Sequence, residues 1–268
     1  MLESSSMNEA IISLLDSDSE NRTPAGDKIY DQPLVGFVDA ADPLFEKMKD
    51  DAIIGSVFRL PGEWLPGAVT IISYFLPFTM AIKKANYKIN EPSEDWMHAR
   101  FLGEKVNDKI RNLIVRMLTE SGGRAIAPVC EPDFAYDHDR GLSNWSERHV
   151  AFAAGLGTFG LSRGLITEKG MAGRFGSVIT DLNFPPSIRS SEVYYKDCPF
   201  LIDKSCGACI DRCPAGAISE EGMDKAACKG QIEKLDQFSG AIRNKYSYPY
   251  SACGKCQVDV PCENSIPD

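Results

Sequence analysis

The spacing of apolar residues along the chain predicts two helices. From Glu94 to Ser121, large apolar side chains fall near one helical face at steps of three to five residues, which is typical of an amphipathic helix. The segment NWSERHVAFAAG, residues 144–155, has the composition of a second, shorter helix. Its predicted N-cap is Ser143 or Asn144, and Gly155 is expected to end it.

Four denser apolar runs predict strands. They are VGFVDAADPL, GAVTIISYFLPF, GGRAIAPV and GSVITDL, which begin at residues 35, 67, 122 and 176. Strands alternating with helices predict an α/β fold for residues 1–195. The polar N-terminus of this range is expected to be frayed. No run approaches the roughly eighteen apolar residues of a membrane span, so no membrane association is expected.

Composition and charge limit the classes of binding partner that can be expected. The chain has 268 residues and a net charge of −9, which argues against broad contact with a phosphate backbone, so no nucleic acid is expected. The N-terminus lacks the basic stretch and apolar core of a signal peptide. The expected location is therefore cytoplasmic, where nine cysteines are better suited to metal ligation than to disulfides.

The cysteines provide the strongest chemical signal. CPFLIDKSCGACIDRCPAGAI, residues 198–218, nearly matches the ferredoxin run C-x2-C-x2-C-x3-C-P, with Asp203 in the first cysteine slot. Eight cysteines fall in the last quarter: Cys198, Cys206, Cys209, Cys213, Cys228, Cys253, Cys256 and Cys262. Eight thiolates suffice for two 4Fe-4S clusters, and residues 196–268 are predicted to form a small ferredoxin-like domain.

Ferredoxin topology divides these thiols into two sets. The cysteine that precedes proline ligates the other cluster, because the chain turns away there. The predicted second set is Cys213, Cys228, Cys253 and Cys256, and the first is Cys198, Cys206, Cys209 and Cys262. The competing interpretation makes Asp203 the ligand in place of Cys198, although a thiolate is the softer and preferred ligand for cluster iron.

Two other uses of the cysteines are less favoured. Zinc would be held by four thiols in a C-x2-C arrangement, but the Cys-Pro pair and PAGAI, taken as the start of a short helix, favour clusters. A disulfide framework is remote for a chain without a secretion signal. Cys130, at the end of an apolar run, is expected to be a buried core thiol.

The stretch GLGTFG, from Gly155 to Gly160, matches G-x-G-x-x-G and has Asp181 about twenty residues on. A dinucleotide fingerprint follows a strand and opens a helix, whereas this stretch is predicted to close one. The dinucleotide interpretation is therefore disfavoured. Glycines at these positions still allow the backbone to approach a flat cofactor.

Three stretches together carry a family resemblance. ERHVAFAAGLGTFGLSRGLIT, GRFGSVITDL and CGACIDRCPAGAI begin at residues 147, 173 and 206. Over roughly residues 140–268 the chain resembles the epoxyqueuosine reductase and reductive dehalogenase superfamily. The resemblance implies a nitroreductase-like α/β domain that holds cobalamin in its base-off form, with electrons delivered singly through two 4Fe-4S clusters.

The resemblance also directs attention to a cofactor cavity between the two domains. Its predicted walls are residues 155–160 and 173–177. The predicted cofactor-binding residues are Gly155, Gly157, Thr158, Gly160, Arg174, Gly176 and Ser177. None of His98, His138 and His149 stands in an Asp-x-His-x-x-Gly motif, so each is expected to be a surface or supporting residue rather than an axial ligand.

The chain departs from that family in two respects. Epoxyqueuosine reductases carry a proton-donating Asp six residues before the Glu of a Glu-Arg pair; counting back from Glu147 gives Gly141, and Asp137 and Asp139 are out of register. No catalytic residue is therefore assigned. Those enzymes also continue into a helical-repeat region that grips tRNA, whereas this chain stops at Asp268, so a small-molecule substrate is expected instead of tRNA.

Two functions stay open. The first is an anaerobic iron-sulfur oxidoreductase that takes electrons from a low-potential donor such as ferredoxin or flavodoxin. Its organic cofactor would be cobalamin or, less favoured, flavin, and that cofactor would reduce the substrate. The second is an electron-transfer protein without an organic cofactor.

Overall fold

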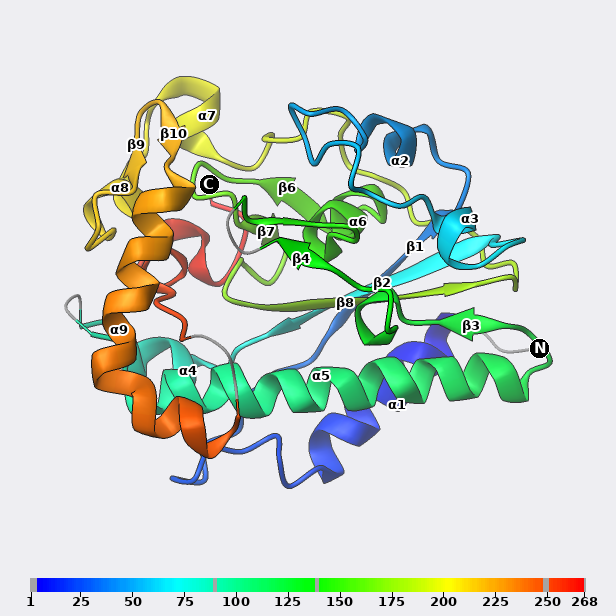
Figure 1. The fold of residues 1–268 in the computed structure, drawn as a ribbon, viewed down its shortest axis with the longest axis horizontal. Helices are drawn as coiled ribbons and strands as arrows, with labels where there is room; N and C mark the ends of the chain where they lie inside the picture. Colours follow the sequence, from blue (N-terminus) through cyan, green and yellow to red (C-terminus); the bar gives the residue numbers. More distant parts are fainter. Residues whose placement is uncertain (1–3, 89–90, 138–139, 248–250, 268) are drawn as a thin grey trace.

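A four-stranded sheet lies at the centre of the molecule (Figure 1). The structure is a computed structural model and describes residues 4–88, 91–137, 140–247 and 251–267. The strand order is β1-β2-β8-β3, and every pairing in this sheet is antiparallel. These strands are β1 (Leu34–Asp39), β2 (Thr70–Pro77), β3 (Ala125–Ile126) and β8 (Gly173–Thr180). The mixed fold is thus built on antiparallel pairs.

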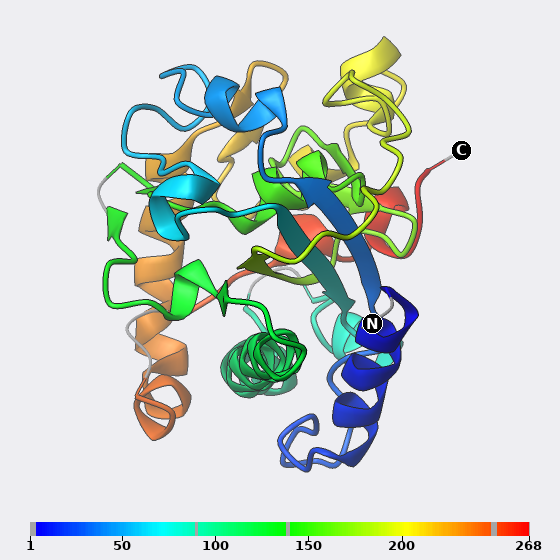
Figure 2. The ribbon, with the colours of Figure 1, turned by 90° about the vertical axis from the view of Figure 1, so that its right-hand side faces the viewer.

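Two helices cover one face of the sheet. The long helix α5 (Glu94–Glu120) runs beneath it, and α1 (Ser4–Ser17) packs beside α5 (Figure 2). In α1, Met7, Ile11 and Leu15 recur every four residues and are buried in the core shared with α5 and the sheet. The expectation of a frayed N-terminus was therefore wrong for residues 4–17, because this apolar stripe has a surface to pack on.

The opposite face carries α6 (Glu147–Ala153) and the short helices α2 (Pro43–Lys47) and α3 (Pro61–Trp64). Trp145 is the largest side chain buried there. It stacks on Phe45 and Phe58, and its indole Nε1 donates a 2.9 Å hydrogen bond to Ser177 Oγ. Short elements complete this side: a 3-10 turn at Pro128–Cys130, and the hairpins β4 (Tyr136–Asp137) with β5 (Leu142–Ser143) and β6 (Gly157–Phe159) with β7 (Leu165–Thr167). Helix α4 (Met80–Ala85) lies on the other side, where it packs against α5.

The C-terminal part consists of short elements and one longer helix. These are α7 (Pro199–Asp203), α8 (Ala208–Asp211), the hairpin of β9 (Ile218–Ser219) and β10 (Gly222–Met223), α9 (Lys225–Lys245), and 3-10 turns at Lys255–Gln257 and Pro261–Glu263. Helix α9 packs on α5 at one end of the molecule (Figure 1). Within the described residues, no helix is both long and apolar enough to cross a membrane.

Several predicted elements need correction. Helix α5 agrees with the prediction to within one residue, but the strand predicted from residue 122 covers only Ala125 and Ile126. Helix α6 begins at Glu147, so Ser143 and Asn144 do not cap it. The short helix predicted after Cys213 is replaced by a turn and by strand β9, because the backbone of Ile218–Ser219 pairs with β10 instead.

Candidate functional site

The C-terminal cysteines are presented by short elements. Cys198 precedes α7, Cys206 lies in the loop before α8, Cys209 lies within α8, and Cys213 follows it. Cys228 lies in the first turn of α9, Cys253 in the segment after it, and Cys256 and Cys262 in the last two 3-10 turns. Segments more than fifty residues apart in sequence therefore converge on one part of the molecule.

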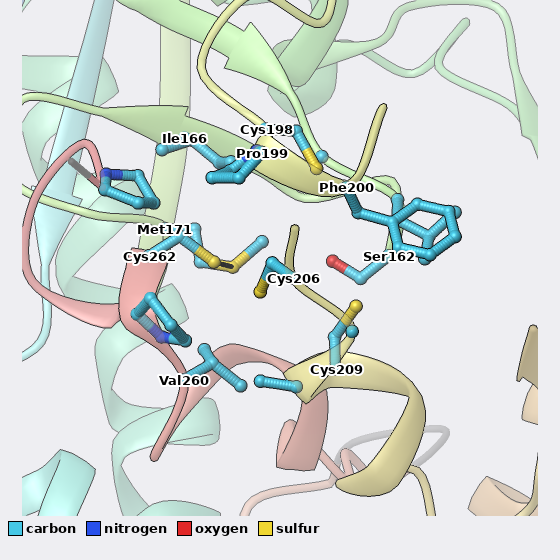
Figure 3. Close-up of a pocket in the computed structure, with 16 residues that line it drawn as sticks. Ser162, Ile166, Met171, Cys198, Pro199, Phe200, Cys206, Cys209, Val260 and Cys262 are labelled. Atoms are coloured by element: carbon cyan, nitrogen blue, oxygen red, sulfur yellow. Dashed lines mark hydrogen bonds between the residues drawn. The ribbon is translucent and has the colours of Figure 1, made fainter. Parts of the chain in front are cut away.

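Four of these cysteines line one cavity, as Figure 3 shows: Cys198, Cys206, Cys209 and Cys262. Apolar side chains close the walls, among them Ile166, Met171, Phe200 and Val260. The backbone N–H of Met171 donates to the carbonyl of Cys262, and Met171 Sδ lies 3.2 Å from Cys262 Sγ. The turn between β7 and β8 thereby fixes the fourth cysteine against the other three.

The electrostatic environment of these thiols reflects the same grouping. Burial, followed by the charges of Cys198 and Cys206, raises the pKa of Cys209 to about 11. Burial and then Cys209 raise the pKa of Cys262 to about 12. Neighbouring thiols that are partly buried resist ionisation together unless a cation lies among them, so the group is suited to binding positively charged iron.

The remaining four cysteines form a second group. Burial and then Cys253 and Cys228 raise the pKa of Cys256, and burial and then Cys253 and Cys213 raise the pKa of Cys228. Cys256 also interacts with Cys209, so the two groups are neighbours. Within the described residues, no three His, Cys, Asp or Glu side chains are arranged to hold a single metal ion.

Asp203, the competing ligand, lies outside the cavity lining. It ends α7 in an exposed turn, where its Oδ1 accepts a 2.9 Å hydrogen bond from the N–H of Ser205. The contacts with Ser205 hold the pKa of this carboxyl below its usual value. The carboxylate therefore has a local structural role of its own.

The predicted cofactor-binding residues lie on two elements. Gly157 and Thr158 belong to β6, flanked by Gly155 and Gly160, and Arg174, Gly176 and Ser177 belong to β8. The GLGTFG stretch closes α6 and opens β6, so it lacks the strand-then-helix context of a dinucleotide site, as predicted.

Most of these residues are engaged within the protein. A Cβ at Gly157 would lie 2.0 Å from the carbonyl of Ile166, and one at Gly176 would lie 2.2 Å from the hydroxyl of Tyr74. The hydroxyl of Thr158 donates to Asp197, and both Thr158 and Ser177 are fully enclosed. Close packing of neighbouring strands accounts for the two glycines, and the binding role of the seven residues stays a prediction.

A buried charge network beneath α6 was not foreseen. Arg111, 2% exposed, pairs with Glu104, Asp108 and Glu147. Burial alone would raise the pKa of Glu104, but the guanidinium groups of Arg111, Arg174 and Arg100 outweigh it and hold that pKa at about 2. Burial raises the pKa of Glu147, whose carboxylate accepts a hydrogen bond from Ser177 Oγ.

A sequence signal for this network exists. Three polar residues follow Glu104 at helical spacing on the otherwise apolar inner side of α5: Asn107, Asp108 and Arg111, which come three, four and seven residues later. Polar residues at helical spacing on a face that packs against a sheet indicate a buried polar cluster.

Cations gather beside the second thiol group. Arg148 lies in the first turn of α6 and is exposed. Its charge lies within reach of Tyr136, Cys256 and Arg163. Lys225, in the first turn of α9, in turn lies close enough to Arg163 and Arg148 for both to lower its pKa after burial does.

The other residues singled out from sequence are placed as follows. His98 is buried, and its Nδ1 is hydrogen-bonded to Tyr246. His149 is packed against Phe159 and bonded to Ser146, and His138 lies outside the described residues. Cys130 is exposed rather than buried, because the 3-10 turn carries it out of the apolar run.

The curated proteins whose sequences align with this chain are epoxyqueuosine reductases. The chain is 27% identical over 210 residues to an epoxyqueuosine reductase of Bacillus cereus, an alignment that covers 75% of this chain and 50% of that protein. The chain thus spans about half the length of this relative. No family model matches the chain.

Solved structures agree in fold. An epoxyqueuosine reductase with a tRNA-Tyr epoxyqueuosine-modified tRNA stem loop gives a TM-score of 0.54 at 17% identity, covering 98% of this chain and 68% of that one. A reductive dehalogenase described with a mechanism for B12-dependent dehalogenation gives 0.50 at 12% identity, covering 82% and 32%. The predicted resemblance is confirmed. The expectation of no nucleic-acid partner is unsupported, since a protein of similar fold has been solved with a tRNA stem loop.

Proposed function

We propose that this protein is an iron-sulfur reductase in which two 4Fe-4S clusters carry single electrons to a corrinoid-type cofactor. The observation that carries the proposal is the convergence of Cys198, Cys206, Cys209 and Cys262 on one cavity, beside a second group of four thiols. Similarity to named reductases supports the reaction class. Residues 196–268 would be the ferredoxin-like cluster domain, and residues 1–195 the reductase domain.

The thiols fit clusters better than a single ion. The first group is spread around an enclosed space with apolar walls (Figure 3), and a four-iron cluster needs one soft thiolate for each iron. The clusters would supply one-electron transfer. The protein's part is to hold the two thiol groups next to each other, to exclude water with Ile166, Met171 and Phe200, and to keep the second group near Arg148.

The corrinoid is the less supported part of the proposal. A relative of similar fold is described as B12-dependent, but Thr158 and Ser177 are occupied by protein partners in this structure. When bound, a corrinoid would supply a low-valent cobalt as the reductant. A cytoplasmic location and a ferredoxin or flavodoxin donor complete the proposal.

Two substrate classes are open to test. The sequence favours a small molecule, whereas the similarity to epoxyqueuosine reductases favours epoxyqueuosine in tRNA. Reconstituted protein should be incubated with cobalamin, a low-potential reductant and tRNA that contains epoxyqueuosine, and the nucleosides analysed by mass spectrometry. Formation of queuosine would replace the small-molecule proposal with the tRNA one.

Iron content tests the clusters directly. After anaerobic reconstitution we expect close to eight irons and eight acid-labile sulfides per chain, four for each cluster. Reduction should give interacting electron paramagnetic resonance signals from two clusters. Four irons, or tightly held zinc, would overturn the two-cluster proposal.

Substitution tests the first ligand set. Cys198→Ala should yield protein prone to a three-iron signal, because the cavity then offers three thiols. Asp203→Ala should retain both clusters, because Asp203 only closes the turn at Ser205. Cys130→Ala, which removes an exposed thiol, is the matched control. The reverse result for Cys198 and Asp203 would make the aspartate the ligand.

The organic cofactor separates this proposal from a plain electron carrier. Cobalamin added to the anaerobic, reconstituted protein should change its absorption spectrum and raise its melting temperature, since a ligand that binds only the folded state stabilises it. If neither changes, the protein should be regarded as an electron-transfer protein without a corrinoid.

A further inference from the structure

Three cations from three separate elements lie close to one another. Arg148 comes from α6, Arg163 from the turn between β6 and β7, and Lys225 from the first turn of α9. Arg148 Nη1 donates to the carbonyl of Arg163, and Lys225 Nζ lies 3.3 Å from the carbonyl of Gly141. No carboxylate in the described ranges forms an ion pair with any of the three.

The backbone conformation at Arg163 supports this arrangement. Arg163 has a φ of +59°, a left-handed conformation that is unusual for a residue with a Cβ. The turn is held there because the N–H of Arg163 bonds to the carbonyl of Gly160, and Gly160 bonds in turn to Gly164. This conformation presents the carbonyl of Arg163 to Arg148 while the Arg163 side chain stays exposed.

Lys225 is placed against the usual electrostatic preference. The first turn of a helix carries partial positive charge and favours acidic side chains, not lysine. The helix end itself is already satisfied, because Asp224 accepts hydrogen bonds from the N–H groups of Ala226 and Ala227. A ligand bound here would therefore meet three cationic side chains rather than the helix backbone.

From this geometry we infer that Arg148, Arg163 and Lys225 form a binding site for a phosphate group. Crowded cations that lack an acidic partner are stabilised by a polyanionic ligand, and the planar guanidinium matches phosphate oxygens in pairs. The inference rests on the proposed function for its meaning: a phosphate held here would lie beside the second thiol group, within reach of Cys256.

Two sources of the phosphate share this chemistry. One is the nucleotide tail of the corrinoid, and the other is a phosphorylated substrate. Cobinamide lacks the nucleotide phosphate that cobalamin carries, so comparing the two corrinoids distinguishes the sources.

The test is calorimetric titration of the reconstituted full chain with inorganic phosphate. Arg163→Asn and Lys225→Gln should each weaken phosphate binding at least about tenfold; Asn tolerates the left-handed backbone at position 163. Lys234→Gln removes an exposed cation from the same helix and should leave binding unchanged. Equal affinity in the variants and the wild type, or no binding at millimolar phosphate, would overturn the inference.

The corrinoid titrations then locate the source. If Arg163→Asn weakens cobalamin binding and spares cobinamide, the site holds the nucleotide tail; if both corrinoids bind the variant normally while phosphate does not, it holds the substrate. If wild-type protein binds phosphate but neither corrinoid, the proposed cofactor fails and the phosphate site stands. Iron content of each variant, equal to that of the wild type, shows that the chain has folded.

Discussion

The sheet region, residues 34–180, and the thiol region, residues 198–263, are held together by different means. All eight residues of β2 are buried between packed faces. In contrast, α8 has no buried residue, and seven of the eight thiols keep intermediate exposure. The apolar cluster of the thiol region includes three side chains of the sheet region: Leu161, Ile166 and Met171.

This difference teaches that apolar burial orders one region while ligation is needed for the other. A short chain with few buried side chains offsets little of its conformational entropy by itself. Metal–thiolate bonds supply folding free energy directly when ligands are brought together. The sheet region should accordingly tolerate iron loss, and the thiol region should not.

Iron removal should give the largest difference between the two regions. Chelation of the reconstituted protein should accelerate amide exchange in residues 206–213 and 253–262 by about a hundredfold or more, because the thiolate bonds that order them are lost. Strand β2 should stay protected. Hydrogen exchange read by mass spectrometry measures both regions together, and unchanged exchange in the thiol region would refute the contrast.

A core substitution tests the other region. Trp145→Ala removes a fully buried ring stacked on Phe45 and Phe58, which should lower the free energy of unfolding by about 3–5 kcal/mol. Ile188→Ala, at an exposed position, should change it by less than about 0.5 kcal/mol. Urea unfolding gives both values. Iron content that falls in step with stability would show that the two regions unfold as one unit.

Breaking the contact between the two regions at Lys255 should lower the free energy of unfolding by a smaller amount. The ammonium of Lys255 is buried and donates to the carbonyls of Asn86 and Glu91 and to Asn86 Oδ1 at 2.7–3.0 Å. Lys255→Met would leave these acceptors unsatisfied, with an expected loss of about 2–3 kcal/mol. Lys234→Met, on the exposed side of α9, is the control, and equal stability of the two variants would contradict this role.

The smallest effect concerns pH. Burial, and then Arg148 and Lys225, lower the pKa of His149 to about 3, below the usual value near 6.5. The unfolded chain therefore takes up the proton first, and stability should fall as pH falls from about 6.5 toward 3, by at most about 1.4 kcal/mol per pH unit. Urea unfolding at pH 7.5 and 5.5 should differ by about 1 kcal/mol more in the wild type than in His149→Gln. An equal pH dependence would mean that His149 ionises normally in the folded protein.

Local signals predicted much of this molecule. The spacing that predicted α5 works because one helical face packs on the sheet. The four cysteines of the predicted first set line one cavity, and the role of all eight as cluster ligands stays a prediction. Pairing over long separations was not predictable. Gly176 suggested a cofactor contact, yet its open side is filled by Tyr74 from β2, about a hundred residues earlier.

The cluster of Arg148, Arg163 and Lys225 shows the same limit. Arg148 and Arg163 both stood in a stretch that was singled out, ERHVAFAAGLGTFGLSRGLIT, whereas Lys225 carried no motif. Only the fold brings the three side chains together from α6, the β6–β7 turn and α9. Topology therefore brings Lys225 close to two arginines that lie far from it in the sequence.

The interleaving of the two thiol groups has a consequence for biosynthesis. In the proposed arrangement each group is completed only by cysteines from residues 253–262, more than fifty residues after Cys198. A ribosome adding about 5–20 residues per second needs roughly 3 s or more to cross that interval. Until then the nascent chain presents incomplete ligand sets, so neither cluster has a finished place to be delivered. Both would mature only after residues 253–262 have been synthesised, and a carrier that delivers clusters would have to wait for the same ten residues.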